Sequence, residues 1–172
     1  MQPLRQPVLA GTRVTLRPTV PADRDALYAV ASDPLVWEMH PAHDRWRAEV
    51  FDAFFDAGLA SGGMLTIRDA DGGAVSGSSR FDNFDAAART IEIGWTFLAR
   101  SHWRTGHNRE AKRLMLDHCF QAVDTVVFTI GENNRRSRAA VEAIGAVERS
   151  GRIERVMAGV PRRHVVYEVR RA

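Results

Sequence analysis

The chain has 172 residues, 45% of them hydrophobic and 26% charged, which is enough for one domain with a proper core and too little for two. Its one cysteine, Cys119, excludes an internal disulfide bond, and no apolar stretch approaches the roughly 20 residues of a membrane-spanning helix. No early segment has the basic start and apolar core of a signal peptide. We therefore expect one domain over residues 1–172, in a cytoplasmic protein.

The charge is distributed unevenly along the chain. Arginine supplies all but one of the 24 basic residues, and Lys112 is the only lysine. Residues 1–99 carry a net formal charge of −4 and residues 100–172 a net charge of +7. The second part would therefore attract a polyanion, either a nucleic acid or the phosphates of a coenzyme, and charge alone does not distinguish between them.

The first half of the chain contains both strand and helix signals. Residues 13–17 alternate as in a strand, and acidic residues in the first turn mark a helix that ends at Asp33 and Pro34. The turn at residues 69–73 predicts a β-hairpin. In order, we expect an N-terminal arm (1–10), a strand (13–17), two helices (21–31 and 45–57) and two strands (64–68 and 74–81).

A strand is predicted for residues 90–98 and a helix from Asn108 onward. Strand alternation would place two sets of side chains on opposite faces, Ile91, Ile93, Trp95 and Phe97 on one and Glu92, Gly94, Thr96 and Leu98 on the other. Helical spacing makes an apolar stripe of Ala111, Leu114, Met115, His118, Cys119 and Ala122. The same spacing leaves for solvent Arg109, Lys112, Arg113 and Asp117.

The loop between this strand and this helix, residues 101–107, predicts a phosphate-binding site. A helix N-terminus presents unpaired backbone N–H groups and the positive end of the helix dipole, and Gly106 lets a ligand approach the backbone closely. Connections that bind nothing can have the same form. The sequence patterns of a P-loop and of a Rossmann dinucleotide site are both absent from the chain.

The last part of the chain returns to the sheet. It is predicted to contain a strand (125–130), a helix (134–144) capped by Asn134, and a closing hairpin (146–156 and 163–169). The resulting order is β-α-α-β-β-β-α-β-α-β-β. We expect no metal site, because no cluster of ligands has the required spacing: His40 and His43 are isolated, and the other histidines, His102, His107, His118 and His164, are scattered.

Two blocks of sequence resemble a known family. The block Trp103-Arg-Thr-Gly-His-Asn-Arg-Glu-Ala-Lys112 resembles the acetyl-CoA-binding motif of the GNAT acyltransferases, in the branch of the ribosomal-protein N-terminal (Rim-type) acetyltransferases. The block Asn134-Arg-Arg-Ser137-Arg-Ala-Ala-Val-Glu142-Ala-Ile-Gly145 is similar to a second signature of that branch. The likeness covers roughly residues 11–169. It implies an α/β (α+β) fold with a mixed, mostly antiparallel central sheet flanked by helices.

The resemblance implies acetyl-CoA as the co-substrate and gives positions for it. Backbone groups near Phe97 and Leu98 would pair with the pantetheine arm. The diphosphate would be held by the loop residues Arg104, Thr105, Gly106, His107, Asn108 and Arg109. The second block would add Asn134, Ser137 and Arg138. Asn108 departs from the family pattern, in which glycine or alanine is common at this position.

The resemblance also implies how acetyl transfer would proceed. Glu92 matches the position of a catalytic glutamate and would act as general base, directly or through water; the alternative is a structural glutamate paired with an arginine. The tyrosine that many GNAT enzymes direct at the departing thiolate is absent, since its position is Val141. Ser137 is the expected substitute. If the Ser137 hydroxyl only caps its helix, Tyr167 is the next candidate.

These features predict an N-acetyltransferase that moves acetyl from acetyl-CoA to a primary amine by direct attack in a ternary complex. The resemblance implies an acceptor that is a protein N-terminal α-amine or a small amine, and the family's geometry would place it between the closing hairpin and a wall that includes Trp37, His40 and Trp46. We expect no nucleic-acid or membrane partner, and the β-rich C-terminus is compatible with a homodimer. The alternative is a non-catalytic module of the same fold that senses CoA or binds nucleic acid, although no aromatic-interleaved basic motif supports it.

Overall fold

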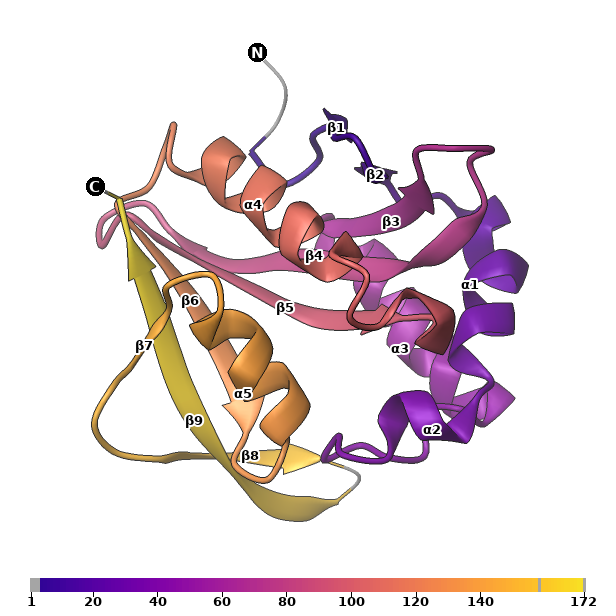
Figure 1. Ribbon diagram of the computed structural model, residues 1–172. Helices are drawn as coiled ribbons and strands as arrows, with labels where there is room; N and C mark the ends of the chain where they lie inside the picture. The colour runs from indigo at the N-terminus through magenta and orange to yellow at the C-terminus, as the bar shows by residue number, and fades with distance from the viewer. Residues whose placement is uncertain (1–3, 158, 172) are drawn as a thin grey trace.

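The computed structural model describes residues 4–157 and 159–171, which form one mixed β-sheet with helices packed against it (Figure 1). Neighbouring strands lie in the order β1-β2-β3-β4-β5-β6-β9-β7, and β8 also pairs with β9. Within the described residues, every pairing is antiparallel except the β5–β6 pair. The strands are Leu9–Ala10 (β1), Val14–Pro18 (β2), Met64–Asp69 (β3), Val75–Asp85 (β4), Thr90–Leu98 (β5), Thr125–Gly131 (β6), Val147–Glu148 (β7), Ile153–Met157 (β8) and Val160–Arg170 (β9).

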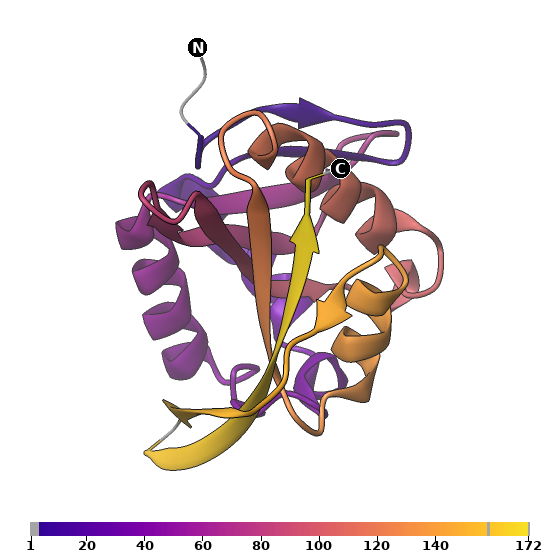
Figure 2. The ribbon, with the colours of Figure 1, turned by 90° about the vertical axis from the view of Figure 1, so that its left-hand side faces the viewer.

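Helices cover both faces of the sheet (Figure 2). One apolar core lies beneath α4 (His107–Cys119) and α5 (Arg135–Glu142), and a second lies beneath α1 (Arg24–Ala31), α2 (Pro34–Trp37) and α3 (Ala48–Ser61). Two short 3-10 turns complete the fold, η1 (Pro21–Asp23) and η2 (Arg100–His102). A helix that is both long enough and apolar enough to cross a membrane does not occur in the described residues. The predicted fold class, a mostly antiparallel mixed sheet flanked by helices, is confirmed.

Most predicted elements are present, with shifted ends. Residues 9–10 of the predicted arm form β1, while residues 1–3 lie outside the described part of the chain. Asp33 and Pro34 follow the end of α1 as predicted, but they also begin α2, because the Asp33 carboxylate accepts a hydrogen bond from the Leu35 N–H at 3.0 Å. The helix predicted from residue 45 is α3, which begins only at Ala48.

Glu110 ties α4 to the edge of the sheet. Its carboxylate accepts hydrogen bonds from the backbone N–H groups of three successive residues, Thr12 at 3.2 Å, Arg13 at 2.7 Å and Val14 at 2.9 Å. It also accepts from the Thr12 hydroxyl at 2.7 Å. Because hydrogen bonds to an ionised carboxylate are among the stronger ones in proteins, this contact holds the first turn of α4 in a fixed place.

A β-bulge interrupts β5 at Trp95, whose φ is +51°. From Gly94 to Phe97 the strand advances by three residues, while the paired segment of β4 advances by two. The extra residue exchanges the faces of the strand, so Trp95 and Phe97 pack in the core beneath α1–α3 and not with Ile91 and Ile93. The prediction that these four side chains share one face was therefore wrong, because it assumed uninterrupted alternation.

The strands β5 and β6 pair over a short stretch and then diverge (Figure 1). Their parallel pairing joins residues 90–92 of β5 to residues 125–127 of β6. Beyond Glu92, the edge of β5 that faces β6 has no strand partner in the described part of the chain. The divergence separates the sheet into a β1–β5 part and a β6–β9 part.

Lys112 is buried in the structure, although helical spacing places it at the solvent. Its side chain lies between α4 and the sheet, and the residue is 4% exposed. The Lys112 ammonium donates to the Ser79 hydroxyl at 2.9 Å and to the Thr96 hydroxyl. Burial lowers the pKa of Lys112 to about 7. The buried face of α4 is therefore wider than its apolar stripe, because two hydroxyls of the sheet give the lysine partners.

We expect Lys112→Met to change how stability depends on pH. The pKa of this lysine is about 7 in the folded chain and ordinarily 10.5, so the unfolded chain binds more protons between these values. The contribution of Lys112 to stability therefore rises with pH across this window and is least favourable below about pH 7. Replacing the lysine should raise the melting temperature at about pH 6 by at least ~2 °C, for a gain of about 1 kcal/mol, and the gain should fade near about pH 10.

Thermal unfolding followed by circular dichroism measures this difference. The Ser79 and Thr96 hydroxyls lie 2.8 Å apart and keep each other as partners in the variant. Arg113→Met, at an exposed neighbour on the same helix, is the control and should keep the pH dependence of the original chain. Identical melting curves for Lys112→Met and the original chain at every pH would contradict the burial of the charge.

Candidate functional site

A cleft with a volume of about 1200 Å³ opens where β5 and β6 diverge. Its walls come from β5 and β6, from the start of α4, from α5, from the segment around α2 and from the β8–β9 hairpin. Ligand pockets for small molecules usually measure roughly 300–1,000 Å³, so this cleft has room for a long ligand and a second molecule beside it.

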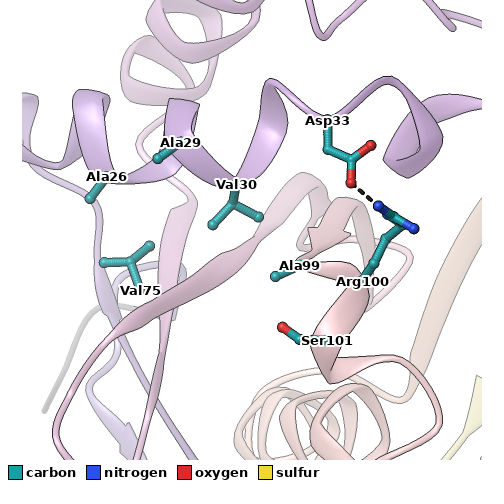
Figure 3. Close-up of a pocket in the computed structure, with 8 residues that line it drawn as sticks. All are labelled: Ala26, Ala29, Val30, Asp33, Val75, Ala99, Arg100 and Ser101. Carbon is teal, nitrogen blue, oxygen red and sulfur yellow. Dashed lines mark hydrogen bonds and ion pairs between the residues drawn. The ribbon is translucent and has the colours of Figure 1, made fainter.

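A second hollow, of about 520 Å³, lies between α1 and the segment that follows β5 (Figure 3). Small side chains such as Ala29 and Ala99 line it, and Asp33 pairs with Arg100 at its edge, with 2.5 Å between the carboxylate oxygen and Nε. This ion pair satisfies both charges. The hollow has no free polar group aimed into it among the described residues, and the larger cleft is the candidate site.

The start of α4 forms a backbone cradle in the cleft. Gly106 is the N-cap of the helix, has a φ of +93°, and offers no side chain to cap the first N–H groups. The Gly106 carbonyl accepts from the Glu110 N–H at 2.9 Å, so the N–H groups of residues 107–109 precede the first intrahelical bond. Arg104 also has a left-handed backbone, with a φ of +62°. Backbone turns of this kind, at a helix N-terminus, suit an anion.

Positive side chains surround the cradle. Arg104, Arg109 and Arg135 line the cleft, and none of them has an acidic partner in the described part of the chain. Arg135 was missed by the sequence analysis, although its place directly after the helix-capping asparagine is a signal that could have found it. Asn108 also lines the cleft, and its buried Oδ1 has no hydrogen-bond partner among the described residues. Such an orphaned atom is expected where a ligand binds.

The free edge of β5 continues the cleft from the cradle. Phe97 and Leu98 line the cleft just beyond the bulge. On this side β5 has lost its pairing with β6, so its main-chain groups are open to a ligand. An extended ligand can hydrogen-bond to such an edge as an additional strand would. The positions predicted for the pantetheine arm therefore lie beside those predicted for the diphosphate.

Glu92 lies in the wall of the cleft, at the last residue of β5 that pairs with β6. The residue is 5% exposed. Its carboxylate accepts hydrogen bonds from Asn83 Nδ2 at 2.6 Å and from Arg155 of β8 at 3.1 Å. The ion pair with Arg155 is the structural alternative that the sequence analysis left open. The structure thus gives Glu92 both a fixed partner and a position on the cleft.

Ser137 lines the cleft from the first turn of α5. Its backbone N–H donates to Asn134 Oδ1 at 3.1 Å, so Asn134 caps the helix as predicted. The Ser137 hydroxyl makes no hydrogen bond to any described residue. The Ser137 hydroxyl thus makes no capping bond to the described residues, and the cap uses the backbone N–H of Ser137 instead.

Arg138 and Tyr167 point away from the cleft, into a network that joins α5 to β7 and β9. Arg138 donates to the Tyr167 hydroxyl at 2.9 Å and pairs with Glu148 at 3.1 Å. Tyr167 is 1% exposed and its hydroxyl donates to Glu142 at 2.7 Å; burial raises its pKa. Arg138 follows Ser137 directly, and one helical residue turns a side chain through about 100°. The placement of Arg138 at the coenzyme, and of Tyr167 as a substitute donor, is therefore corrected.

The far end of the cleft contains two of the three residues predicted to meet the acceptor. Trp37 and His40 line it, whereas Trp46 lies in the loop before α3 and is 39% exposed. The late start of α3 accounts for this difference. Burial and the nearby Arg45 lower the pKa of His40 to about 3, so its imidazole is neutral near pH 7. The closing hairpin contributes Arg155, Met157 and His164.

Two histidines that are scattered in the sequence meet in the structure. The rings of His102 and His107 lie 4.6 Å apart, centre to centre, and both face Asp69. The tight turn between residues 103 and 106 brings them together, and neither periodicity nor ligand spacing reveals this. The other residues of the segment 103–109 line the cleft, but His107 does not.

Comparison with known proteins places this site in a family. Residues 13–147 match a family model that is described as an acetyltransferase (GNAT) domain. Among solved structures, a putative acetyltransferase from T. thermophilus is 28% identical, with a TM-score of 0.77 over 95% of this chain and 88% of that one. Mycobacterium smegmatis RimJ in complex with CoA-disulfide is 22% identical, with a TM-score of 0.78 over 99% of this chain and 90% of that one.

A putative ribosomal-protein-serine acetyltransferase from Vibrio cholerae has the same fold at 14% identity, with a TM-score of 0.79 over 97% of this chain and 99% of that one. The segment that matches the family contains the cradle, Glu92 and Ser137, and it spans most of the chain. The chain therefore belongs to the GNAT acetyltransferase family and is an acetyltransferase that uses acetyl-CoA.

Proposed function

We propose that this enzyme transfers acetyl from acetyl-CoA to a primary amine by direct attack of the amine in a ternary complex. The observation that carries the proposal is that Glu92, Ser137 and the Gly106 cradle all line one cleft. A carboxylate, a hydroxyl and an anion-binding loop are the groups that this reaction needs for the amine, the thiolate and the phosphates. Cys119 is fully buried, and burial raises the pKa of its thiol, which argues against an acyl-cysteine intermediate.

The coenzyme would lie along the wall formed by α4 and β5. The backbone cradle at Gly106 and the unpaired Arg104, Arg109 and Arg135 would hold its phosphates. The free edge of β5 near Phe97 would hold the uncharged pantetheine arm by main-chain hydrogen bonds. The charged and uncharged parts of the ligand thus meet matching parts of the cleft.

Glu92 would take the proton that the amine loses. As the amine nitrogen attacks the thioester carbonyl, a C–N bond forms and the C–S bond breaks, so one proton must leave nitrogen and the thiolate must gain one. Asn83 and Arg155 hold the Glu92 carboxylate in one orientation. The transfer can be direct or pass through one water, since an oriented carboxylate serves in either case.

Ser137 would meet the departing thiolate. Its hydroxyl is free of partners among the described residues and lies on the cleft, and a hydroxyl can donate to a developing negative charge. Val141, which replaces the tyrosine found in many relatives, is buried and cannot donate. Tyr167 is committed to the network with Glu142, which leaves Ser137 as the donor on α5.

The acceptor would enter between the α2 segment and the β8–β9 hairpin. Trp37 and the neutral His40 give that end an apolar and weakly polar wall. A protein N-terminal α-amine is the leading acceptor class, since two of the similar structures are RimJ and a putative ribosomal-protein-serine acetyltransferase. A small-molecule amine is the second.

The alternative role is binding of nucleic acid through the basic second part of the chain. The ion pairs do not support it, because they occupy most of the basic side chains there. At least nine of the fifteen basic side chains in residues 100–172 pair with a carboxylate. Their charge is therefore largely neutralised locally. Three arginines that have no carboxylate partner among the described residues, Arg104, Arg109 and Arg135, line the cleft, where they suit a phosphorylated coenzyme better than a polymer.

Saturating acetyl-CoA should raise the melting temperature, and Gly106→Val should abolish that rise. A ligand at about 100 times its Kd adds about 2.7 kcal/mol to stability, or roughly 5–10 °C here. A side chain at a φ of +93° is strained and would force the cradle to rearrange. Gly151→Val is the matched control, because Gly151 has a φ of +91° with open space around it. If both variants keep the rise, the cradle does not bind the coenzyme.

Glu92→Gln should lower kcat by about 10²-fold or more while leaving acetyl-CoA affinity nearly unchanged, since general-base catalysis typically contributes about 10²–10⁴-fold. Arg155→Gln removes the same ion pair but keeps the carboxylate, so it should lose far less kcat. Steady-state kinetics and melting curves of both variants separate the roles. Equal loss of stability in the two variants, with full turnover per folded molecule, would make Glu92 a structural partner of Arg155.

Ser137→Ala should slow the chemical step by up to about 10²–10³-fold, the usual effect of losing one donor to a developing charge. Coenzyme binding should barely change, and α5 should stay intact because the cap uses the Ser137 backbone N–H. Single-turnover acetyl transfer measures the step. Ser137→Thr keeps a hydroxyl and should retain much of the rate; a wild-type rate in Ser137→Ala would assign the protonation to water.

A further inference from the structure

Three side chains from separate segments converge beside the coenzyme cradle. They are Asp69 at the end of β3, His102 in η2 and His107 at the first residue of α4. His102 Nε2 lies 3.0 Å and His107 Nε2 lies 3.8 Å from the same oxygen, Asp69 Oδ1. The three side chains are only 17–23% exposed. Both imidazoles thus direct the same ring nitrogen at one carboxylate oxygen.

The outer nitrogens of the two rings are held by hydroxyl groups. His102 Nδ1 lies 2.9 Å from the Ser101 hydroxyl, and His107 Nδ1 lies 2.6 Å from the Thr105 hydroxyl. Thr105 already donates its proton to the His102 carbonyl oxygen at 2.7 Å, and a carbonyl can only accept. The Thr105 hydroxyl must therefore accept from His107 Nδ1–H. In the neutral ring this leaves the lone pair on Nε2, directed at Asp69.

Asp69 Oδ1 is correspondingly without a hydrogen bond. The atom is buried and has no hydrogen-bond partner among the described residues, because His102 Nε2 meets the hydrogen-bond geometry only toward Asp69 Oδ2, at 3.1 Å. An acceptor on His107 therefore faces an acceptor on Asp69. A cation between two lone pairs that face each other at 3.8 Å would satisfy both atoms.

We propose that Asp69, His102 and His107 form a binding site for a divalent transition-metal ion, with Zn²⁺ the expected occupant. Two imidazole nitrogens and one carboxylate oxygen are a common set of three protein ligands, with water in the remaining position. The separations of 3.0 and 3.8 Å lie on either side of the roughly 3.3 Å between neighbouring ligand atoms of a tetrahedral zinc site. The Ser101 and Thr105 hydroxyls supply the outer contacts that orient metal-binding histidines.

The site would connect metal binding to the coenzyme loop. His102 and His107 stand at the two ends of the segment 103–106, which contains the left-handed turn at Arg104 and Gly106. A bound ion would fix both ends of that turn to Asp69 of β3 and so favour the cradle conformation. This consequence rests on the proposed role of the cradle, whereas the metal site itself does not.

Zinc titration of the chelator-treated protein tests the site directly. Isothermal calorimetry with ZnCl₂ should show one tight site in the original chain, and Asp69→Asn, His102→Gln and His107→Gln should each weaken it at least tenfold. His43→Gln, at an exposed histidine elsewhere, is the matched control and should bind as the original chain does. Co²⁺ in place of Zn²⁺ should give the visible absorption spectrum of a site with nitrogen and oxygen ligands, without a thiolate band. This measurement tests the site in the original chain and needs no variant.

The outcomes separate the metal site from the function of the cleft. Melting curves recorded without metal show whether each variant is folded, and Asp69→Asn keeps the shape of the side chain it replaces. Zinc binding that is equally weak in the original chain and in Asp69→Asn, or binding that His43→Gln removes, would overturn the proposal. An acetyl-CoA affinity that does not respond to zinc, with the site itself present, would overturn only the coupling to the cradle.

Discussion

The cleft depends on the short parallel pairing of β5 with β6. Main-chain hydrogen bonds join these strands only at residues 90–92 and 125–127, while β4 and β9 hold their outer edges by antiparallel pairing. The sheet therefore cannot close again after the strands diverge. Buried main-chain groups need partners, so the inner edge of β5 is a place where solvent or an extended ligand must complete the sheet. Glu92 and Ser137 then stand on the two sides of this opening, on β5 and α5.

Much of the fold follows from local patterns in the sequence. A few neighbouring residues set each of these signals: the hydrophobic periodicity of a strand or helix, the acidic first turn of α1 and the cap at Asn134. The structure contains the helices and strands that these signals predict, with their ends shifted by a few residues. The loop before α4 is equally local, since a glycine at a helix N-terminus needs no distant contact to expose backbone N–H groups. These features of the fold and of the candidate site could be predicted.

The rest of the site depends on contacts between residues far apart in the sequence, which hydrophobic periodicity does not reveal. Lys112 is buried because Ser79 and Thr96, on two other strands, provide oxygens for its ammonium. Tyr167 is withdrawn from the cleft by Glu142, which lies 25 residues away in the sequence. His102 and His107 meet only because the turn between them takes a left-handed conformation. Each of these outcomes is set by three-dimensional partners, and a sequence pattern can name the residue but not the direction of its side chain.

The bulge at Trp95 decides which core the residues after it enter. The strand contributes to both cores, with Phe97 in the one beneath α3 and Leu98 in the one beneath α4. Straightening the strand while keeping every residue would exchange these two side chains, leaving a void in one core and crowding in the other. Deleting the extra residue would instead restore plain alternation and leave Phe97 and Leu98 on their present faces, because Phe97 would still lie opposite Ser78. A substitution that keeps the bulge therefore disturbs only its own neighbours.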